Sequence, residues 1–293
     1  VKKISVLLRM NMMEEAKEAV EELLRNDPEL YDGYHMKTAI LLEEKKYPEA
    51  ILCAKEAAER FPDDADLMYD YANATALSGA YEQALQIVSN AKQMKYFEDA
   101  KARFCFLESE ICAELGNMDR AIEKCDECIS LETEQDFFSD ARFMRINLAL
   151  AKNDFESALQ HAEQFIEKGA RDSYYYAALY FRPFCLSKLG KEEAAEKYYK
   201  EAISLYRMAT LQNLEVFDAY LYRAMCLKEI RQYEEALKLL EFIENMSNQI
   251  AEVHTIRADV YKLTGKEGLA KEELEKAFQL KPELKAVYSE GGE

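Results

Sequence analysis

The feature that most constrains the fold is an alanine that recurs along the whole chain at nearly constant spacing. Eight segments of four residues end in this alanine, and successive copies lie 34, 34, 37, 37, 37, 41 and 34 residues apart. The segments are Met13–Ala16, Tyr47–Ala50, Tyr81–Ala84, Met118–Ala121, Phe155–Ala158, Glu192–Ala195, Tyr233–Ala236 and Glu267–Ala270. A repeat of this length predicts one supersecondary unit stacked many times, because a single unit of that size cannot bury its own apolar face.

Further marks recur in step with the alanine. A proline follows it by 12 residues in three copies: Pro28, Pro62 and Pro282. A small residue follows it by seven in five copies: Ala57, Ala91, Cys128, Ala202 and Ala277. Glycines mark the turn before it: Gly79, Gly116, Gly190 and Gly265. Small residues also mark the preceding apolar segment: Ala72, Ser109, Ala224 and Ala258. Helices approach closely only where side chains are small, so these positions predict helix contacts.

These residues resemble the tetratricopeptide-repeat (TPR) family, whose repeat of 34 residues is a helix-turn-helix. The resemblance covers nearly all of the chain. It implies an all-α fold, a right-handed superhelical solenoid of TPR hairpins that forms a single array over residues 1–293. We expect hairpins at roughly 1–27, 31–61, 65–95, 102–132, 139–169, 176–208, 217–247 and 251–281, with a C-terminal capping segment at 282–293.

Three features depart from the family pattern. The 37-residue spacings predict longer helices or turns in the middle of the array, and the 41-residue spacing predicts an extended second helix around 204–214. Pro183 falls at the tight-contact position of a first helix, where a proline removes a hydrogen bond and either acts as a hinge or is simply tolerated. The chain begins at Val1 and its first copy is short, so we expect a piece of a longer protein.

Composition favours helices and a protein partner. Only 9 Gly and 5 Pro occur among 293 residues, which is too few for many strands and tight turns. The net charge is −18, whereas nucleic acids and anionic membranes are bound by basic surfaces. No apolar run approaches the roughly 18 residues that a membrane span needs. We therefore expect an acidic protein whose partner is a protein or peptide, with basic residues favoured, and not nucleic acid or membrane.

The sequence offers little for catalysis. The cysteines are odd in number and lie mostly in apolar helical patterns, as expected of reduced thiols in a cytoplasmic protein. Cys125 and Cys128 have the spacing of a redox or zinc half-motif, but no second such pair follows and both fall at hairpin-packing positions. No glycine-rich phosphate loop or nucleophile elbow is present. We predict no catalytic residue, no metal site, no cofactor and no enzymatic activity.

By the same resemblance, the first helix of each repeat lines a concave groove. Repeat position 5 supplies an aromatic row in the middle of the array, and position 9 supplies amides one helical turn away. The candidate groove residues are Tyr69, Asn73, Phe106, Phe143, Asn147, Tyr180 and Phe184. Exposed aromatic side chains anchor interfaces, and asparagine amides can clamp the backbone of an extended peptide. The resemblance therefore implies a non-enzymatic protein–protein interaction scaffold that binds a partner peptide or helix in the concave groove.

Each of these features has an alternative. The aromatic row could pack between neighbouring first helices, the acidic residues at position 2 could offset helix dipoles, and the asparagines could be solvated. The aromatic run at 174–181 could form a hairpin core or a hydrophobic patch. The array could also self-assemble edge to edge. Finally, the chain could be the TPR module of a larger co-chaperone, for example with a J domain, or of a peptide-sensing regulator.

One class of TPR ligand is excluded. Some TPR co-chaperones hold the carboxylate tail of a heat-shock chaperone with Lys, Asn and Arg side chains from three successive first helices. From the second repeat onward the corresponding positions hold His35, Ala39, Asp70, Arg103 and Leu107. No other run of three repeats rebuilds the cationic set. We therefore expect no chaperone tail of the carboxylate-clamp type as the partner.

Overall fold

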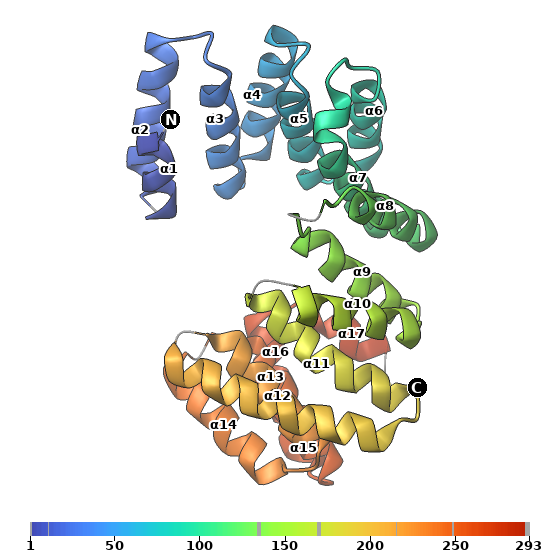
Figure 1. Cartoon of the computed structure of the whole chain (residues 1–293). Coiled ribbons are helices and arrows are strands. Elements are labelled where there is room, and N and C mark those ends of the chain that lie inside the picture. The colour runs from blue at the N-terminus through green and yellow to red at the C-terminus, as the bar shows by residue number, and fades with distance from the viewer. Residues whose placement is uncertain are drawn as a thin grey trace. The chain divides into compact units, whose positions relative to one another are not determined.

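The computed structural model describes residues 2–10, 12–133, 136–168, 171–214, 216–247 and 249–290, and within these it holds seventeen helices and no strand (Figure 1). The first helices of the hairpins are α1 (Lys2–Arg9), α3 (Tyr31–Glu43), α5 (Ala65–Leu77), α7 (Phe97–Glu114), α9 (Ser139–Ala151), α11 (Ser173–Lys188), α13 (Phe217–Glu229) and α15 (Ala251–Leu263). The second helices are α2 (Met13–Asn26), α4 (Tyr47–Arg60), α6 (Tyr81–Ala91), α8 (Met118–Ser130), α10 (Phe155–Lys168), α12 (Glu192–Gln212), α14 (Tyr233–Met246) and α16 (Glu267–Leu280). A last helix, α17 (Leu284–Glu290), follows them.

The recurring alanine sits at the tightest helix contact of every hairpin. Each second helix begins at the first residue of the four-residue segment, three residues before the alanine. The eight alanines are at most 1% exposed, and the small residues seven positions later are at most 3% exposed. The small residues of the first helices, Ala72, Ser109, Ala224 and Ala258, are fully buried. The predicted register of helix packing is confirmed.

The turns inside the hairpins share one backbone conformation. The residue five positions before the recurring alanine has a positive φ in seven hairpins. It is Gly79, Gly116, Gly190 or Gly265 in four of them, with φ of 70–85°, and Lys45, Asn153 or Arg231 in the other three, with φ of 56–64°. Glycine reaches this left-handed region without strain, whereas a side chain there costs energy. The glycines predicted to mark the turn do so for this reason.

Residues 1–141 form one compact unit, drawn from blue to green in Figure 1. In this unit α3 packs on α5 and α5 packs on α7, while each second helix packs on the first helix of its own hairpin. A cluster of buried side chains that includes Phe104, Leu107 and Ile111 joins α5, α6 and α7. The helices α3, α5 and α7 therefore form a continuous first-helix layer in unit 1.

Residues 142–293 form a second compact unit, and the division falls within α9. Here α11 packs on α13 and α13 packs on α15. Buried clusters join α13, α14 and α15 around Leu240 and Ile243, and around Leu227 and Val260. The aromatic run at 174–181 opens α11, and Tyr175, Leu179 and Tyr180 of this run are buried, as its core-packing reading predicts.

Longer helices accommodate two of the three 37-residue spacings and the 41-residue spacing, whereas α9, in the remaining 37-residue spacing, has only 13 residues. The helix α7 has 18 residues and α11 has 16, against 13 in α3, α5, α13 and α15. The helix α12 has 21 residues and reaches Gln212, which confirms the extended second helix. Pro183 lies inside α11 and is buried, and the helix continues past it to Lys188.

Candidate functional site

The first-helix layer of unit 1 is linked by polar side chains at the predicted groove positions. His35 of α3 forms a hydrogen-bonded ion pair with Asp70 of α5. Arg103 of α7 forms an ion pair with Asp66, in the first turn of α5. These contacts span three successive hairpins. These polar contacts therefore join α3 to α5 and α5 to α7 within this unit.

Tyr69 is the aromatic centre of this layer. Its ring packs edge-on against Phe104 at a centroid distance of 5.6 Å, and the guanidinium carbon of Arg103 lies 4.0 Å from its centroid. Burial raises the pKa of the Tyr69 hydroxyl, although part of the side chain still reaches the surface. Tyr69 thus packs between neighbouring first helices and also contributes to the exposed face. Asn73 lies one turn further along α5 and is likewise half-buried.

A cavity of about 410 Å³ opens beside Arg103. Its apolar lining comes from Phe106 of α7 and from Phe137 and Phe138, which precede α9. Arg103 and Asp140 add one cation and one carboxylate. The three phenylalanines are only partly buried, so the cavity offers aromatic surface to a ligand. Phe106 is the predicted groove residue that lines this cavity.

Carboxylates gather next to this cavity. Glu110 lies one turn beyond Phe106, and loss of surrounding water together with the carboxylates of Asp140 and Glu114 raises the pKa of Glu110 to about 7. Glu110 and Glu114 stand in the C-terminal half of α7, where the helix dipole disfavours negative charge. Helix stabilisation therefore does not account for these two acids.

In unit 2 the predicted groove residues are engaged mainly in ring packing. Phe143 stacks on Tyr174 at 4.4 Å, and Phe184 stacks on Tyr180 at 5.8 Å. Tyr180 is only 4% exposed and offers almost no surface to a partner. Phe143 and Phe184 remain half-exposed, and Asn147 is exposed. Tyr180 is therefore left out of the candidate surface.

Some contributors to the site were absent from the predicted set. Phe137 and Phe138 lie in the segment that joins two hairpins, where repeat positions give no guidance. Their sequence signal is an adjacent pair of large apolar residues in an otherwise polar connection. Asp70 and Arg103 stand at repeat positions 6 and 2. Their part in joining neighbouring first helices is seen only in the structure, where Asp70 pairs with His35 and Arg103 pairs with Asp66.

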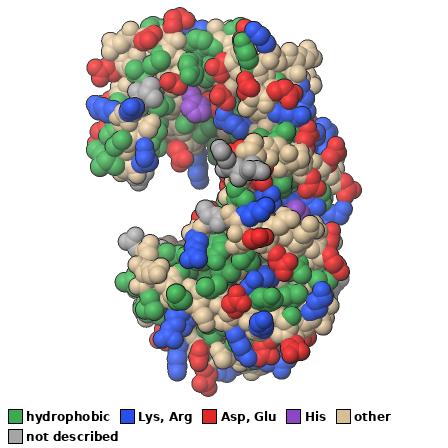
Figure 2. Space-filling view, viewed as in Figure 1, with side chains coloured by type: hydrophobic (Ala, Val, Ile, Leu, Met, Phe, Trp, Pro, Cys, Tyr) green, Lys and Arg blue, Asp and Glu red, His purple; other side chains and the backbone are tan. Residues whose placement is uncertain are grey.

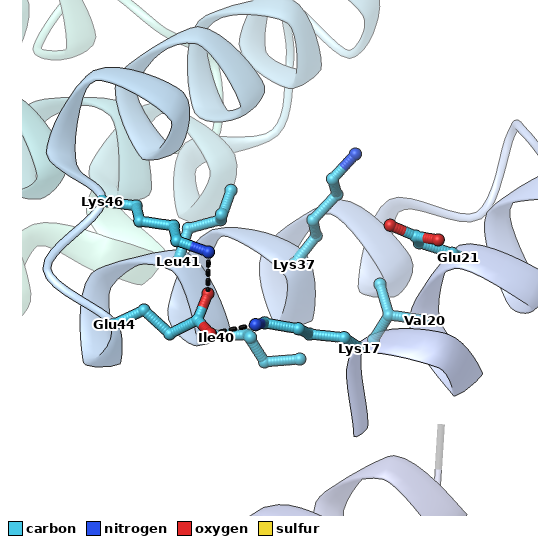
Figure 3. A pocket seen from close by; sticks show the side chains of 8 residues that line it. All are labelled: Lys17, Val20, Glu21, Lys37, Ile40, Leu41, Glu44 and Lys46. Atoms are coloured by element: carbon cyan, nitrogen blue, oxygen red, sulfur yellow. Dashed lines mark ion pairs between the residues drawn. The ribbon is translucent and has the colours of Figure 1, made fainter. Parts of the chain in front are cut away.

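A second cavity in unit 1, of about 270 Å³, lies between α2 and α3 and is mainly ionic (Figure 3). Lys17 and Lys46 both form ion pairs with Glu44, while the Lys37 side chain points away from them. The pairing of Lys17 lowers the pKa of Glu44, which keeps that carboxyl ionised. These ion pairs tie α2 to the end of α3.

The seven cysteines are buried, and none of them forms a disulfide bond in the structure. The thiol of Cys125 donates a hydrogen bond to the carbonyl oxygen of Ala141 at 2.9 Å, and burial raises the pKa of Cys128 to about 12. Both cysteines therefore pack in the interior, as the sequence predicts. Among the described residues, no three His, Cys, Asp or Glu side chains are grouped so as to hold a metal ion. No helix in the described ranges is long and apolar enough to cross a membrane.

Sequence models of tetratricopeptide repeats match residues 41–102, 102–135, 176–207 and 251–284, which together make up more than half of the chain. The chain belongs to the TPR family. A comparison with curated protein sequences finds no match. TPR repeats are protein-interaction modules, so this TPR protein is an interaction scaffold, built on a fold that is typically non-enzymatic.

Solved structures agree on the fold. The quorum sensor NprR from B. thuringiensis, in its apo form, matches with a TM-score of 0.68 and 13% identity over 95% of this chain and 85% of its own. PilF of Pseudomonas aeruginosa matches with a TM-score of 0.56 and 15% sequence identity, over 76% of this chain and 95% of the PilF chain. A chain of the APC/C hetero-tetramer Cut9–Hcn1 matches with a TM-score of 0.59 and 15% sequence identity, over 92% of this chain. This TPR chain spans 50% of that APC/C chain.

Proposed function

We propose that unit 1 binds an extended segment of a partner protein across its first-helix layer. In this proposal an aromatic or large aliphatic side chain of the partner enters the cavity at Phe106, and a neighbouring Lys or Arg meets Glu110 and Asp140. The observation that carries it is the cavity of about 410 Å³, whose three phenylalanines adjoin a group of carboxylates.

The cavity supports an apolar anchor. Interfaces gain most of their affinity from a few large side chains that fill desolvated pockets. Phe106 is held by α7, whose next residue Leu107 is 2% exposed and anchored in the core. Phe137 and Phe138 close the cavity from the segment before α9. A rigid helix on one side and a connecting segment on the other give the pocket a defined shape.

The charges support a basic neighbour to that anchor. Arg103 is already engaged by Asp66 and Tyr69. Burial, and then repulsion from Asp140 and Glu114, raise the pKa of Glu110. A Lys or Arg of the partner would relieve that repulsion. Figure 2 shows acidic side chains scattered over the surface, so local arrangement decides where a cation binds.

Asn73 and the unit 2 residues have subordinate roles in this proposal. Asn73 lies one turn from Tyr69 and can pair with the backbone of an extended segment, since its amide both donates and accepts. Phe143, Asn147 and Phe184 retain exposed surface and are proposed to contact a longer partner segment within their own unit. The location of this protein is proposed to be cytoplasmic, in keeping with an odd number of buried cysteines that are not paired in disulfides.

The test is selection of short random peptides on immobilised protein, followed by fluorescence anisotropy with the selected peptides. We expect sequences that combine an aromatic residue with Lys or Arg. Phe106→Ala should weaken binding by about tenfold or more, because it removes the wall of the pocket. Glu110→Gln should weaken it several-fold by removing a charge.

The matched control is Leu52→Ala on α4, which removes a side chain of large exposed area (58%) from a second helix of the same unit. Binding by this variant should equal that of the wild type. Equal losses from Leu52→Ala and Phe106→Ala, with both variants folded by circular dichroism, would show that the cavity is not the binding site.

A sensor function is the second candidate, favoured by the likeness to the quorum sensor NprR over 95% of this chain. At 13% identity that likeness concerns the fold. The two candidates differ in the ligand: a sensor binds a short free peptide, whereas a scaffold binds a segment inside a folded protein. Reading the complete gene for a J domain or a DNA-binding domain would separate a co-chaperone module from a regulator.

A further inference from the structure

Four first helices of unit 2 carry an arginine at one repeat position, thirteen residues before the recurring alanine. This arginine ladder consists of Arg145, Arg182, Arg223 and Arg257. In unit 1 the same position holds other residues, among them Glu108. The position lies next to the second helices of its own and of the preceding hairpin. A charged side chain there needs a partner of opposite charge, because much of it is removed from water.

The neighbouring second helices supply that partner in other hairpins. Arg257, with 9% of its side chain exposed, pairs with Glu244 at 2.7 Å and with Glu273 at 3.0 Å. Arg182 pairs with Glu201 at 3.2 Å and lies over the ring of Tyr198 at 3.8 Å. In both cases the carboxylate that pairs with the arginine lies on a second helix, either of the same hairpin or of the preceding one.

The same geometry holds in unit 1 with reversed charge. Glu108, with 4% of its side chain exposed, pairs with Lys92 at 2.8 Å. Lys92 and Glu244 both stand eight residues after the recurring alanine of the preceding second helix. Glu273 and Glu201 stand three and six residues after the alanine of their own second helix. Three positions therefore supply the counter-charge.

Arg223 has no carboxylate at any of these positions. The three places hold Ile203, Leu239 and Phe242. Ile203 and Leu239 pack together with Leu227, which lies one turn from Arg223 on α13. No ion pair joins Arg223 to any described residue within 4.0 Å, and its Nε is buried without a hydrogen-bond partner. Arg182 also has an unpartnered Nε, but its Nη2 is held by Glu201.

The surroundings of Arg223 add to the unmet positive charge. Burial, and then the like charge of Arg207, lower the pKa of Arg223, while the carboxylate of Glu235, which forms no ion pair with it, acts in the opposite sense. Arg207 lies in the extended part of α12 and likewise forms no ion pair with a described residue. Leu211, one turn beyond Arg207 on the same helix face, is 76% exposed. Two unpaired guanidinium groups thus lie close together in a chain of net charge −18.

Apolar surface flanks the arginines on the other side. Phe242 of α14 is 46% exposed and packs against Tyr220 at a centroid distance of 5.7 Å. Tyr220 lies one turn before Arg223 on α13. The surface therefore combines two cations with exposed apolar side chains from α12 and α14, and Figure 2 shows hydrophobic side chains reaching the surface of unit 2.

We propose that Arg223 and Arg207 together bind the carboxylate of an Asp or Glu in a partner protein, whose adjacent apolar residues contact Leu211 and Phe242. The partner's carboxylate supplies from outside the chain the counter-charge that Glu244 and Glu273 provide for Arg257. Nucleic acid is disfavoured as the occupant, because two cations on a strongly acidic chain do not make a phosphate-binding surface. This surface binds an acidic residue, whereas the cavity at Phe106 is proposed to bind a basic one. The two proposals do not depend on each other.

Stability measurements form the first arm of the test. Arg223→Leu should leave the Tm unchanged or raise it, because it replaces an uncompensated cation with an apolar side chain. Arg257→Leu, the matched control, should lower the Tm by several degrees, because it strands Glu244 and Glu273. A fall in Tm for Arg223→Leu as large as that for Arg257→Leu would show that Arg223 has a partner inside the protein, and the proposal would fail.

Peptide binding forms the second arm. Helical peptides that carry Asp or Glu beside Leu or Phe are selected on the Phe106→Ala variant, so that the unit 1 cavity contributes nothing. Arg223→Leu and Arg207→Gln should each weaken binding at least tenfold, and replacing the peptide carboxylate by its amide should cause a similar loss. On the Arg223→Leu variant, the amide peptide should bind as well as the carboxylate peptide. The contact between Arg223 and the carboxylate is already lost in that variant, so removing the carboxylate costs nothing more.

Three results would overturn the proposal. The first is a peptide that binds equally well with and without its carboxylate. The second is binding of a DNA oligonucleotide or a phosphopeptide, but not of the carboxylate peptide, that depends on Arg223. The third is a dimeric mass in light scattering that becomes monomeric in Arg223→Leu, which would make a second copy of this chain the occupant.

Discussion

His35 and Asp70 join two neighbouring hairpins through a hydrogen bond between Nδ1 and Oδ2. The imidazole is about half exposed, whereas the Asp70 side chain is only 8% exposed. An ionised carboxylate in that position needs a positive partner. The pair therefore places a titratable contact inside the first-helix layer of unit 1, next to Tyr69 and Arg103.

The first prediction concerns the titration of His35. Its hydrogen bond to Asp70 raises the pKa of His35 above 6.5, against the opposing effects of burial and Arg103. The contact then stabilises the fold fully below pH 6.5, and this contribution is lost as the pH rises through the folded pKa. NMR titration should show the raised pKa, and Asp70→Asn should return it toward the ordinary value. An unshifted His35 in the wild type would contradict the pairing.

The second prediction concerns Glu110. Its pKa of about 7 means that the folded protein holds a proton that the unfolded chain releases near pH 4.5. Stability should therefore fall as the pH rises from 4.5 to 7, and Glu110→Gln should weaken that dependence. Binding of a basic peptide should instead strengthen across pH 7, as the carboxyl ionises. Thermal unfolding over pH 5–8 measures the effect on stability, and fluorescence anisotropy over the same range measures the effect on peptide binding. If the pH profiles of wild type and Glu110→Gln are identical, both expectations are wrong.

The third prediction tests the packing register. Ala84→Leu and Ala121→Leu should each lower the free energy of unfolding by about 1–3 kcal/mol, because both alanines are fully buried where two helices touch. Ala151→Leu, at the exposed end of α9, is the control and should change it by less than about 0.5 kcal/mol. Urea titration followed by circular dichroism gives the comparison. Equal effects at all three alanines would mean that the contact positions are misassigned.

The fourth prediction concerns the turns. Gly190→Ala should lower the free energy of unfolding by about 1 kcal/mol, because Gly190 has a φ of 73° and a methyl group there meets no neighbouring atom. The cost is thus one of backbone conformation alone. Arg231 has a φ of 64° in the equivalent turn, so Arg231→Gly should be neutral or stabilising by up to about 1 kcal/mol. A loss of stability in Arg231→Gly would show that its side chain has a role of its own.

Much of the site could be anticipated from repeat positions, but not its chemistry. Position 5 marks Tyr69 of α5 and Phe106 of α7 as equivalent residues of neighbouring first helices, because side chains on a helix recur with a fixed period. It also marks Tyr180, which four neighbouring aromatic rings bury. Whether an aromatic side chain at that position is covered depends on the residues that the next hairpin presents, and a position within one repeat does not contain that information.

The hairpin array itself was determined by the sequence alone. Small residues at helix contacts, glycines at left-handed turns and the helix boundaries are set by local sterics, which repeat in every copy. Tertiary structure decided which charges are compensated. Arg257 finds Glu244 and Glu273, while the corresponding positions for Arg223 hold Ile203, Leu239 and Phe242. The physical reason is that a buried charge is satisfied by side chains from two other helices, and only the stacking of hairpins brings these together.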